Sequence, residues 1–152
     1  MQRRPIGDSP EEQLLKGQAH KHARETLKHY ENTKNYIGAY VIIFSLFEDR
    51  IRALCVLHNR DVKKIEYKEK IASSLTKIIS GLKKDKVLPK DVYVPAFELA
   101  RKRNALIHEA LYSLNAFTKE HVEELKHIEK QLDAIRRKLK RRIAADAKSQ
   151  ST

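Results

Sequence analysis

Apolar residues recur along most of this chain at steps of three and four positions, the spacing that places them on one face of an α-helix. The most apolar segment predicts a helix over residues 33–59. Similar stripes predict helices over 65–82, from Pro95 to about residue 114, and over 118–145. At 1.5 Å per residue the last of these would be roughly 40 Å long, which is more than a compact bundle needs. We therefore expect its end to project from the bundle or to pair with another chain.

Short-range signals predict where these helices begin and end. Residues 9–12, with the sequence Ser-Pro-Glu-Glu, supply an N-cap, a proline at the first helical position and a capping box, so the first helix should begin there. The polar residues 31–33 should break or bend it. Gly81 should end the third helix, and residues 83–94 should form a loop before Pro95 starts the fourth helix.

The composition supports an all-helical chain. Of its 152 residues, 41% are hydrophobic and 34% charged, and only 4 are glycine and 4 proline, so helix breakers are scarce. We predict an all-α fold, a four- to five-helix bundle with a long C-terminal helix. The helical domain should span residues 9–146, between a basic N-terminal arm at 1–8 and a polar tail at 147–152.

The charge balance favours a polyanionic partner. The formal net charge of +12 makes nucleic acid the first candidate and an anionic membrane surface the second. The longest apolar run, residues 37–47, is too short to cross a bilayer, and the N-terminal residues lack the hydrophobic run of a signal peptide. Cys55 is the single cysteine and should be a buried thiol, which suits a reducing compartment. We expect a cytoplasmic protein that does not enter a membrane.

Two polar residues interrupt apolar stripes and are therefore candidates for function. The predicted core stripe of the fourth helix consists of Phe97, Ala100, Ile107, Leu111 and Leu114. Asn104 falls within this stripe, with Arg103 beside it and His108 one turn further on. A buried amide needs hydrogen-bond partners, so these three side chains should converge on one surface. Glu48 interrupts a stripe of the second helix, where a carboxylate should pair with an arginine or border a cleft.

The run Arg103-Asn104-Ala105-Leu106-Ile107-His108 resembles the Arg-Asn-x-x-x-His signature of HEPN domains (higher eukaryotes and prokaryotes nucleotide-binding). Domains of this family are small all-α bundles, and many are metal-independent endoribonucleases of toxin–antitoxin, abortive-infection and CRISPR-associated antiphage defence systems. The resemblance implies cleavage of single-stranded RNA without metal or other cofactor. It also implies a homodimer with a composite active site, and an antitoxin or another defence-system protein as a candidate partner.

The chemistry of such a site assigns roles to particular residues. In this reading the catalytic residues are Arg103, Asn104 and His108: histidine takes the proton from the ribose 2′-hydroxyl, arginine stabilises the anionic phosphorane, and asparagine orients the phosphate or the imidazole. Glu48 is a candidate orienting carboxylate. Basic residues near the motif and in the last helix are candidates for RNA binding: Arg101, Lys102, Arg136, Arg137, Lys138, Lys140, Arg141 and Arg142. No His, Cys or carboxylate cluster has metal-ligand spacing, and His20, His22 and His29 should be solvated or structural.

The looser family pattern, Arg-x4–6-His, occurs three times in the chain. Arg24 with His29 and Arg52 with His58 also satisfy it, but an asparagine follows the arginine only at Arg103. One branch of the family carries a tyrosine two residues after the histidine, where this chain has Ala110. Two other classes of function stay open: a catalytically inactive HEPN-like protein that binds RNA or a partner protein, and a helical scaffold whose last helix forms coiled coils. For the basic segment 136–142, a solvated helix face is the alternative to RNA binding.

Overall fold

The computed structural model describes residues 10–61, 74–110, 112–113 and 116–150. Within these ranges every regular element is a helix. The helices are α1 (Pro10–Asn32), α2 (Tyr36–Asp61), α4 (Leu75–Lys84), α5 (Lys90–Ala110) and α6 (Lys119–Gln150). The all-α fold and the long C-terminal helix are confirmed. The predicted cap at Ser9, the basic arm 1–8 and residues 65–73 of the third predicted helix lie outside the described residues.

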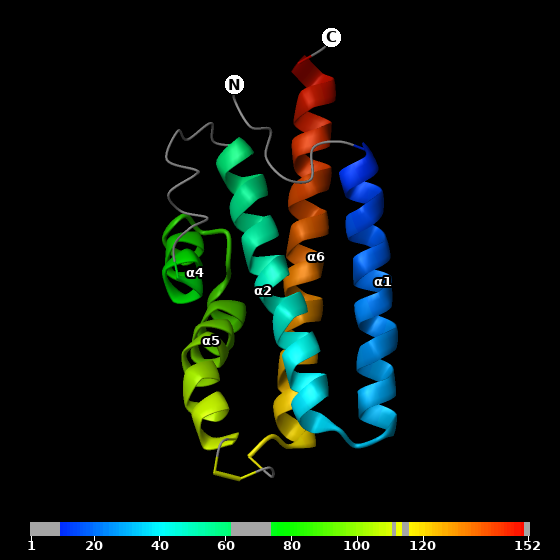
Figure 1. Ribbon diagram of the computed structural model, residues 1–152. Coiled ribbons are helices and arrows are strands. Elements are labelled where there is room, and N and C mark those ends of the chain that lie inside the picture. The colour runs from blue at the N-terminus through cyan, green and yellow to red at the C-terminus, as the bar shows by residue number, and fades with distance from the viewer. Residues whose placement is uncertain (1–9, 62–73, 111, 114–115, 151–152) are drawn as a thin grey trace, which may run out of the picture.

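Helices α2 and α6 form the centre of the bundle. They pack against each other along their length, with α1 on one side and the shorter pair α4 and α5 on the other (Figure 1). The C-terminal turns of α6 extend past the ends of its neighbours in this view. The core lies where α2 and α6 meet, with Tyr40, Phe47 and Ile51 of α2 and Leu125 and Leu132 of α6 almost fully buried. The predicted core stripe of α2 is confirmed.

The junction between α1 and α2 follows the prediction of a break near residues 31–33. Lys34 has a positive φ of 58°, and the side-chain oxygen of Asn35 accepts a hydrogen bond of 3.0 Å from the backbone N–H of Gly38. This contact caps the start of α2. Cys55 is buried, as predicted.

The predicted boundaries of α4 and α5 were wrong. Gly81 does not end α4, which continues to Lys84, and Pro95 lies inside α5 instead of at its start. The turn is made at Lys86, whose φ is 61°, and the carbonyl of Pro89 accepts the first N–H groups of α5. Pro95 is tolerated in the second turn of α5 because it removes only one intrahelical hydrogen bond, close to the N-terminus of the helix, where the first N–H groups have no intrahelical partner in any case.

The last helix is longer than the sequence indicated. It has 32 residues, roughly 48 Å at 1.5 Å per residue, and it includes residues 147–150, which had been assigned to a polar tail. Its final turns are rich in alanine and lysine and have no glycine or proline, so nothing stops the helix there. Among the described helices, none combines the length and the apolar character that spanning a bilayer would require.

Candidate functional site

The Arg-Asn-x-x-x-His motif lies on an exposed face of α5. Arg103, Asn104 and His108 are all exposed, so the prediction that Asn104 is buried in the core stripe was wrong. The buried stripe of α5 consists of Val92, Ala96 and Leu99. It is displaced by one residue from the predicted stripe, and one residue corresponds to about 100° of rotation about the helix axis. This rotation turns Asn104 toward solvent.

Arg103 is held against α2 by an aromatic side chain. Its guanidinium carbon lies 4.8 Å from the centre of the Phe44 ring, within cation–π distance. The Tyr40 ring lies 6.0 Å from Phe44, and the Tyr40 hydroxyl is buried without a hydrogen-bond partner in the described part of the chain. Burial raises the pKa of Tyr40 to about 12, although the nearby charge of Arg103 acts in the opposite direction. The aromatic contact fixes Arg103 in place while leaving its N–H groups free to donate.

Asn104 and His108 lie one helical turn apart beside Arg103. The three side chains spread over roughly 140° of the helix circumference, with Ile107 between them. Ile107 is 44% exposed, contrary to its predicted place in the core. The ring of His108 meets that of Tyr112 edge-on at 5.7 Å. Within the described residues, neither Arg103, Asn104 nor His108 makes a hydrogen bond or an ion pair, so their polar atoms are available to a ligand.

The two competing Arg–His pairs are placed differently. Arg24 is bound to Glu129 at 2.7 Å, and Arg52 is bound to Glu48 at 2.9 Å. His58 is buried and contacts Asp85 at 3.0 Å. In both of these pairs the arginine is already engaged in an ion pair, in contrast to Arg103.

The structure does not place all of the other predicted site residues in contact with the motif. Glu48 pairs with an arginine, as predicted, but that arginine is Arg52 on its own helix, and no hydrogen bond or ion pair in the described structure joins Glu48 to the motif. Arg101 is exposed and hydrogen bonds to Glu98 at 2.8 Å. Lys102 is exposed. These contacts do not assign Glu48 an orienting role.

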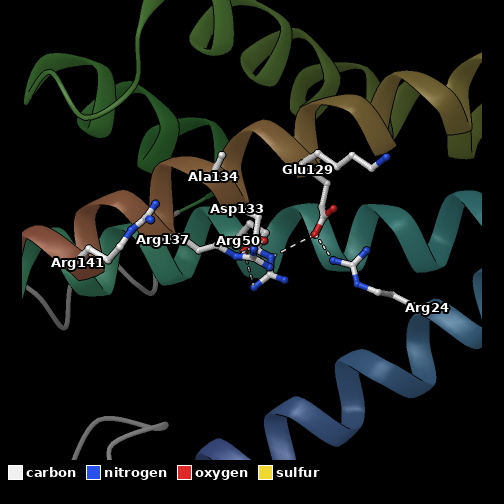
Figure 2. A pocket seen from close by; sticks show the side chains of 8 residues that line it. Arg24, Arg50, Glu129, Asp133, Ala134, Arg137 and Arg141 are labelled. Carbon is white, nitrogen blue, oxygen red and sulfur yellow. Dashed lines mark hydrogen bonds and ion pairs between the residues drawn. The ribbon is translucent and has the colours of Figure 1, made fainter.

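A second group of charged residues, which sequence reasoning missed, lies between α1, α2 and α6. Glu129 of α6 is 1% exposed, and its Oε1 accepts hydrogen bonds from Arg24 of α1 at 2.7 Å and from Arg50 of α2 at 3.2 Å (Figure 2). One turn further along α6, the carboxylate of Asp133 lies 3.4 Å from Arg50 and 3.0 Å from Arg137. One buried carboxylate therefore ties all three long helices together.

The electrostatics of Asp133 follow from its neighbours. Burial alone would raise the pKa of its carboxyl group, but the hydrogen bond from Arg136 and the charges of Arg50 and Arg137 outweigh burial and hold the pKa below its ordinary value. Asp133 therefore stays ionised and keeps the arginines around it in fixed positions.

These charged side chains line an open pocket of about 570 Å³. Its walls come from α1, α2 and α6, and α5 contributes no lining residue, so the pocket is separate from the Arg-Asn-x-x-x-His motif. Arg137 and Arg141, which were predicted to bind RNA, line it. Arg24, Arg50 and Lys130 join them, although the sequence did not indicate any of the three as an RNA-binding residue.

The histidines of α1 behave as expected. His20 contacts Asp49 at 2.9 Å, and His22 and His29 are exposed. In the parts of the chain that the structure describes, no three His, Cys, Asp or Glu side chains are grouped so that they could hold a metal ion. Comparison with known protein families, with curated proteins and with solved structures finds no match for this chain.

Proposed function

We propose that this protein is a metal-independent endoribonuclease that cleaves single-stranded RNA with Arg103, Asn104 and His108. The observation that carries the proposal is an exposed Arg–His pair on α5 whose members have no hydrogen-bond or ion-pair partner among the described residues. The competing pairs lack this property, because Arg24 and Arg52 are bound to carboxylates. A cation and an imidazole on a helix, with no hydrogen-bond or ion-pair partner in the described chain, suit a role on a bound phosphate.

The reaction needs only groups that this face supplies. His108 accepts the proton of a ribose 2′-hydroxyl, the 2′-oxygen forms a bond to the adjacent phosphorus, and the bond from phosphorus to the 5′-oxygen breaks. Arg103 stabilises the charge on the phosphorane, and Asn104 donates a hydrogen bond that orients the phosphate. The departing 5′-oxygen takes up a proton from water, and the other product carries a 2′,3′-cyclic phosphate.

A second protomer would complete this site. One chain supplies a single motif histidine, whereas cleavage is faster with both a base and an acid. The motif face also exposes Ile107, and Tyr112 beside it is 82% exposed, so apolar surface is available for contact with another copy. The proposed active form is a homodimer with the α5 helices near the twofold axis. A light-scattering mass of one chain in a sample that still cleaves would contradict it.

The proposal also covers the residues that hold the RNA, the cellular location and the partner protein. Arg101, Lys102 and the basic segment 136–142 would hold the RNA backbone, as the net charge of +12 favours. We place the protein in the cytoplasm, in a toxin–antitoxin or antiphage defence system, with an antitoxin-like protein as a candidate partner. Binding of RNA without cleavage is the alternative function, and the same charge supports it.

The test is cleavage of a labelled single-stranded RNA in excess EDTA. Wild-type protein should cut the RNA and leave a 2′,3′-cyclic phosphate or the 3′-phosphate derived from it. His108→Ala and Arg103→Ala should each lower the rate by at least about a hundredfold, in the range that loss of a general base or an oxyanion donor produces. Asn104→Ala should have an intermediate effect.

The matched control is His29→Ala. His29 belongs to one of the competing pairs and is exposed, so its removal should leave both the fold and the cleavage rate within a few-fold of wild type. His58 is a poorer control because it is buried against Asp85, and its loss would disturb the fold. Activity that disappears with EDTA and returns with magnesium would refute the mechanism, and RNA binding without any cleavage would favour the alternative.

A further inference from the structure

The pocket between α1, α2 and α6 carries a strong excess of positive charge. Five cations line it, namely Arg24, Arg50, Lys130, Arg137 and Arg141, against the two carboxylates Glu129 and Asp133. Its volume of about 570 Å³ lies within the usual range of ligand sites. The cations exceed the carboxylates by three, and this net positive charge attracts anions.

The carboxylates do not oppose such a ligand, because they are already neutralised. Glu129 is almost fully buried at the base of the pocket and accepts from two guanidinium groups. Asp133 is shared among Arg50, Arg136 and Arg137. Each contact leaves most of the five N–H donors of its arginine unused. The carboxylates thus fix the arginines in position, and the remaining N–H groups can donate to phosphate oxygens with little loss of side-chain entropy.

The extent of the pocket indicates more than one phosphate. Lys130, Arg137 and Arg141 follow one side of α6 over roughly 16 Å, since 11 residues rise by 1.5 Å each. In Figure 2, Arg137 and Arg141 lie in succession along α6, and Arg24 reaches in from α1 near Glu129. Lys130 and Arg141 are exposed and make no ion pair within the described ranges. A single small anion would meet only part of this surface.

We propose that this pocket is a binding site for a chain of phosphate groups, either the backbone of a single-stranded nucleic acid or a free polyphosphate. The cations of α6 contact successive phosphates, while Arg24 and Arg50 contact the ligand from α1 and α2. Of the basic segment 136–142, Arg137 and Arg141 contact the ligand, because the other cations of the segment do not line the pocket. The site does not depend on whether the motif of α5 cleaves RNA.

The experiment measures binding of inorganic tripolyphosphate by calorimetry at fixed ionic strength, with sulfate as the single-anion comparison. The variant Lys130→Gln/Arg141→Gln removes two pocket cations that hold no structural ion pair in the described chain. It should melt as wild type does and should weaken tripolyphosphate binding by at least about tenfold, as expected for the loss of two charge-assisted contacts. The matched control is Lys77→Gln/Lys119→Gln, which removes the same charge from exposed positions outside the pocket.

A second variant tests the pocket without removing a cation. Ala134 is an exposed lining residue, and Ala134→Glu would add a carboxylate inside the site; it should prevent binding while the helix is retained. Equal weakening by the pocket pair and the control pair, no binding of tripolyphosphate by the wild-type protein, or equally tight binding of sulfate would each overturn the proposal.

A competing oligonucleotide separates the two sources of the phosphate chain. An oligo(dT) of about ten residues has a phosphate backbone but no 2′-hydroxyl, so the proposed nuclease reaction cannot consume it. If it displaces tripolyphosphate, the site takes a nucleic-acid backbone. If it does not, the site takes a free polyphosphate. Because the readout is binding and the motif is untouched, failure here is distinguishable from failure of the proposed cleavage.

Discussion

Glu129→Gln tests whether the buried carboxylate holds α1, α2 and α6 together. The substitution keeps the shape of the side chain but removes the charge that neutralises Arg24 and Arg50. The side chain of Arg50 is only 10% exposed, so its charge would lose a partner in a place that water barely reaches. Breaking a buried pair in this way costs about 3–5 kcal/mol.

The structure favours the lower end of this range. Asp133 still lies 3.4 Å from Arg50, and the side chain of Arg24 is 45% exposed, so it can turn toward water. We therefore expect Glu129→Gln to lower the free energy of unfolding by about 3 kcal/mol. For a chain of this size that loss corresponds to a decrease in Tm of roughly 6–12 °C.

Urea unfolding followed by circular dichroism at 222 nm measures this effect. The matched control is Glu123→Gln on the same helix, whose side chain is 51% exposed and 3.8 Å from Lys126; it should cost less than about 0.5 kcal/mol. A loss below about 1 kcal/mol for Glu129→Gln would refute the reasoning, because it would mean that Arg50 does not need this partner.

Two further measurements follow from the contacts of single residues. Gly17→Ala should raise the free energy of unfolding by up to about 1 kcal/mol, because alanine is the better helix former and a Cβ at Gly17 meets nothing within 4 Å. Gly38→Ala should lower the free energy of unfolding by about 1 kcal/mol, because the new Cβ would lie 3.0 Å from three atoms of the Tyr30 ring. Stabilisation by both glycine substitutions would contradict this account. Asp133 has a lowered pKa, so its contribution to stability is complete above its unfolded value of about 3.9 and is lost as the pH falls toward the folded value. Asp133→Asn should therefore lower the free energy of unfolding at pH 7. Below about pH 4, urea titrations should show a smaller further decrease for the variant than for the wild type. An equal decrease in both would show that other carboxylates control stability in acid.

The helices were predictable because their signals are local. The core stripe of α2 repeats over many turns, and its period alone determines which face is buried. The boundaries of α4 and α5 were not predictable in the same way. Gly81 and Pro95 carry the usual signals for helix ends, but the turn at Lys86 and the carbonyl of Pro89 set the actual ends. Those contacts depend on backbone geometry that no single residue type specifies.

The candidate site could be predicted only in part. The motif residues are close together because they share one helix, and this follows from their spacing. Their exposure did not follow, because the stripe of α5 is short and a shift of one residue exchanges a buried face for an exposed one. Phe44 and Tyr40 beside Arg103 were recognisable only as core residues of α2. No signal in the sequence relates them to an arginine about sixty positions away.

The contrast between Asn104 and Glu129 shows what the sequence lacks. Both residues interrupt an apolar stripe, and Glu129 falls four positions after Leu125 and three before Leu132. The structure buries Glu129 and exposes Asn104. A buried carboxylate requires cationic partners, and Glu129 has them in Arg24 and Arg50 on two other helices.

Among the described residues, no partner of this kind lies beside Asn104, so exposure is the less costly arrangement for this side chain. The presence or absence of an ion-pair partner also distinguishes the three Arg–His pairs. Arg24 is needed to neutralise Glu129, and Arg52 is engaged with Glu48, so neither can be removed or redirected without a structural cost. Arg103 has no ion pair in the described structure, and its contact with the Phe44 ring uses none of its N–H groups in a hydrogen bond. Of the three motif arginines, Arg103 is therefore the one without an ion pair in the described structure, which is why the proposed cleavage site is assigned to α5.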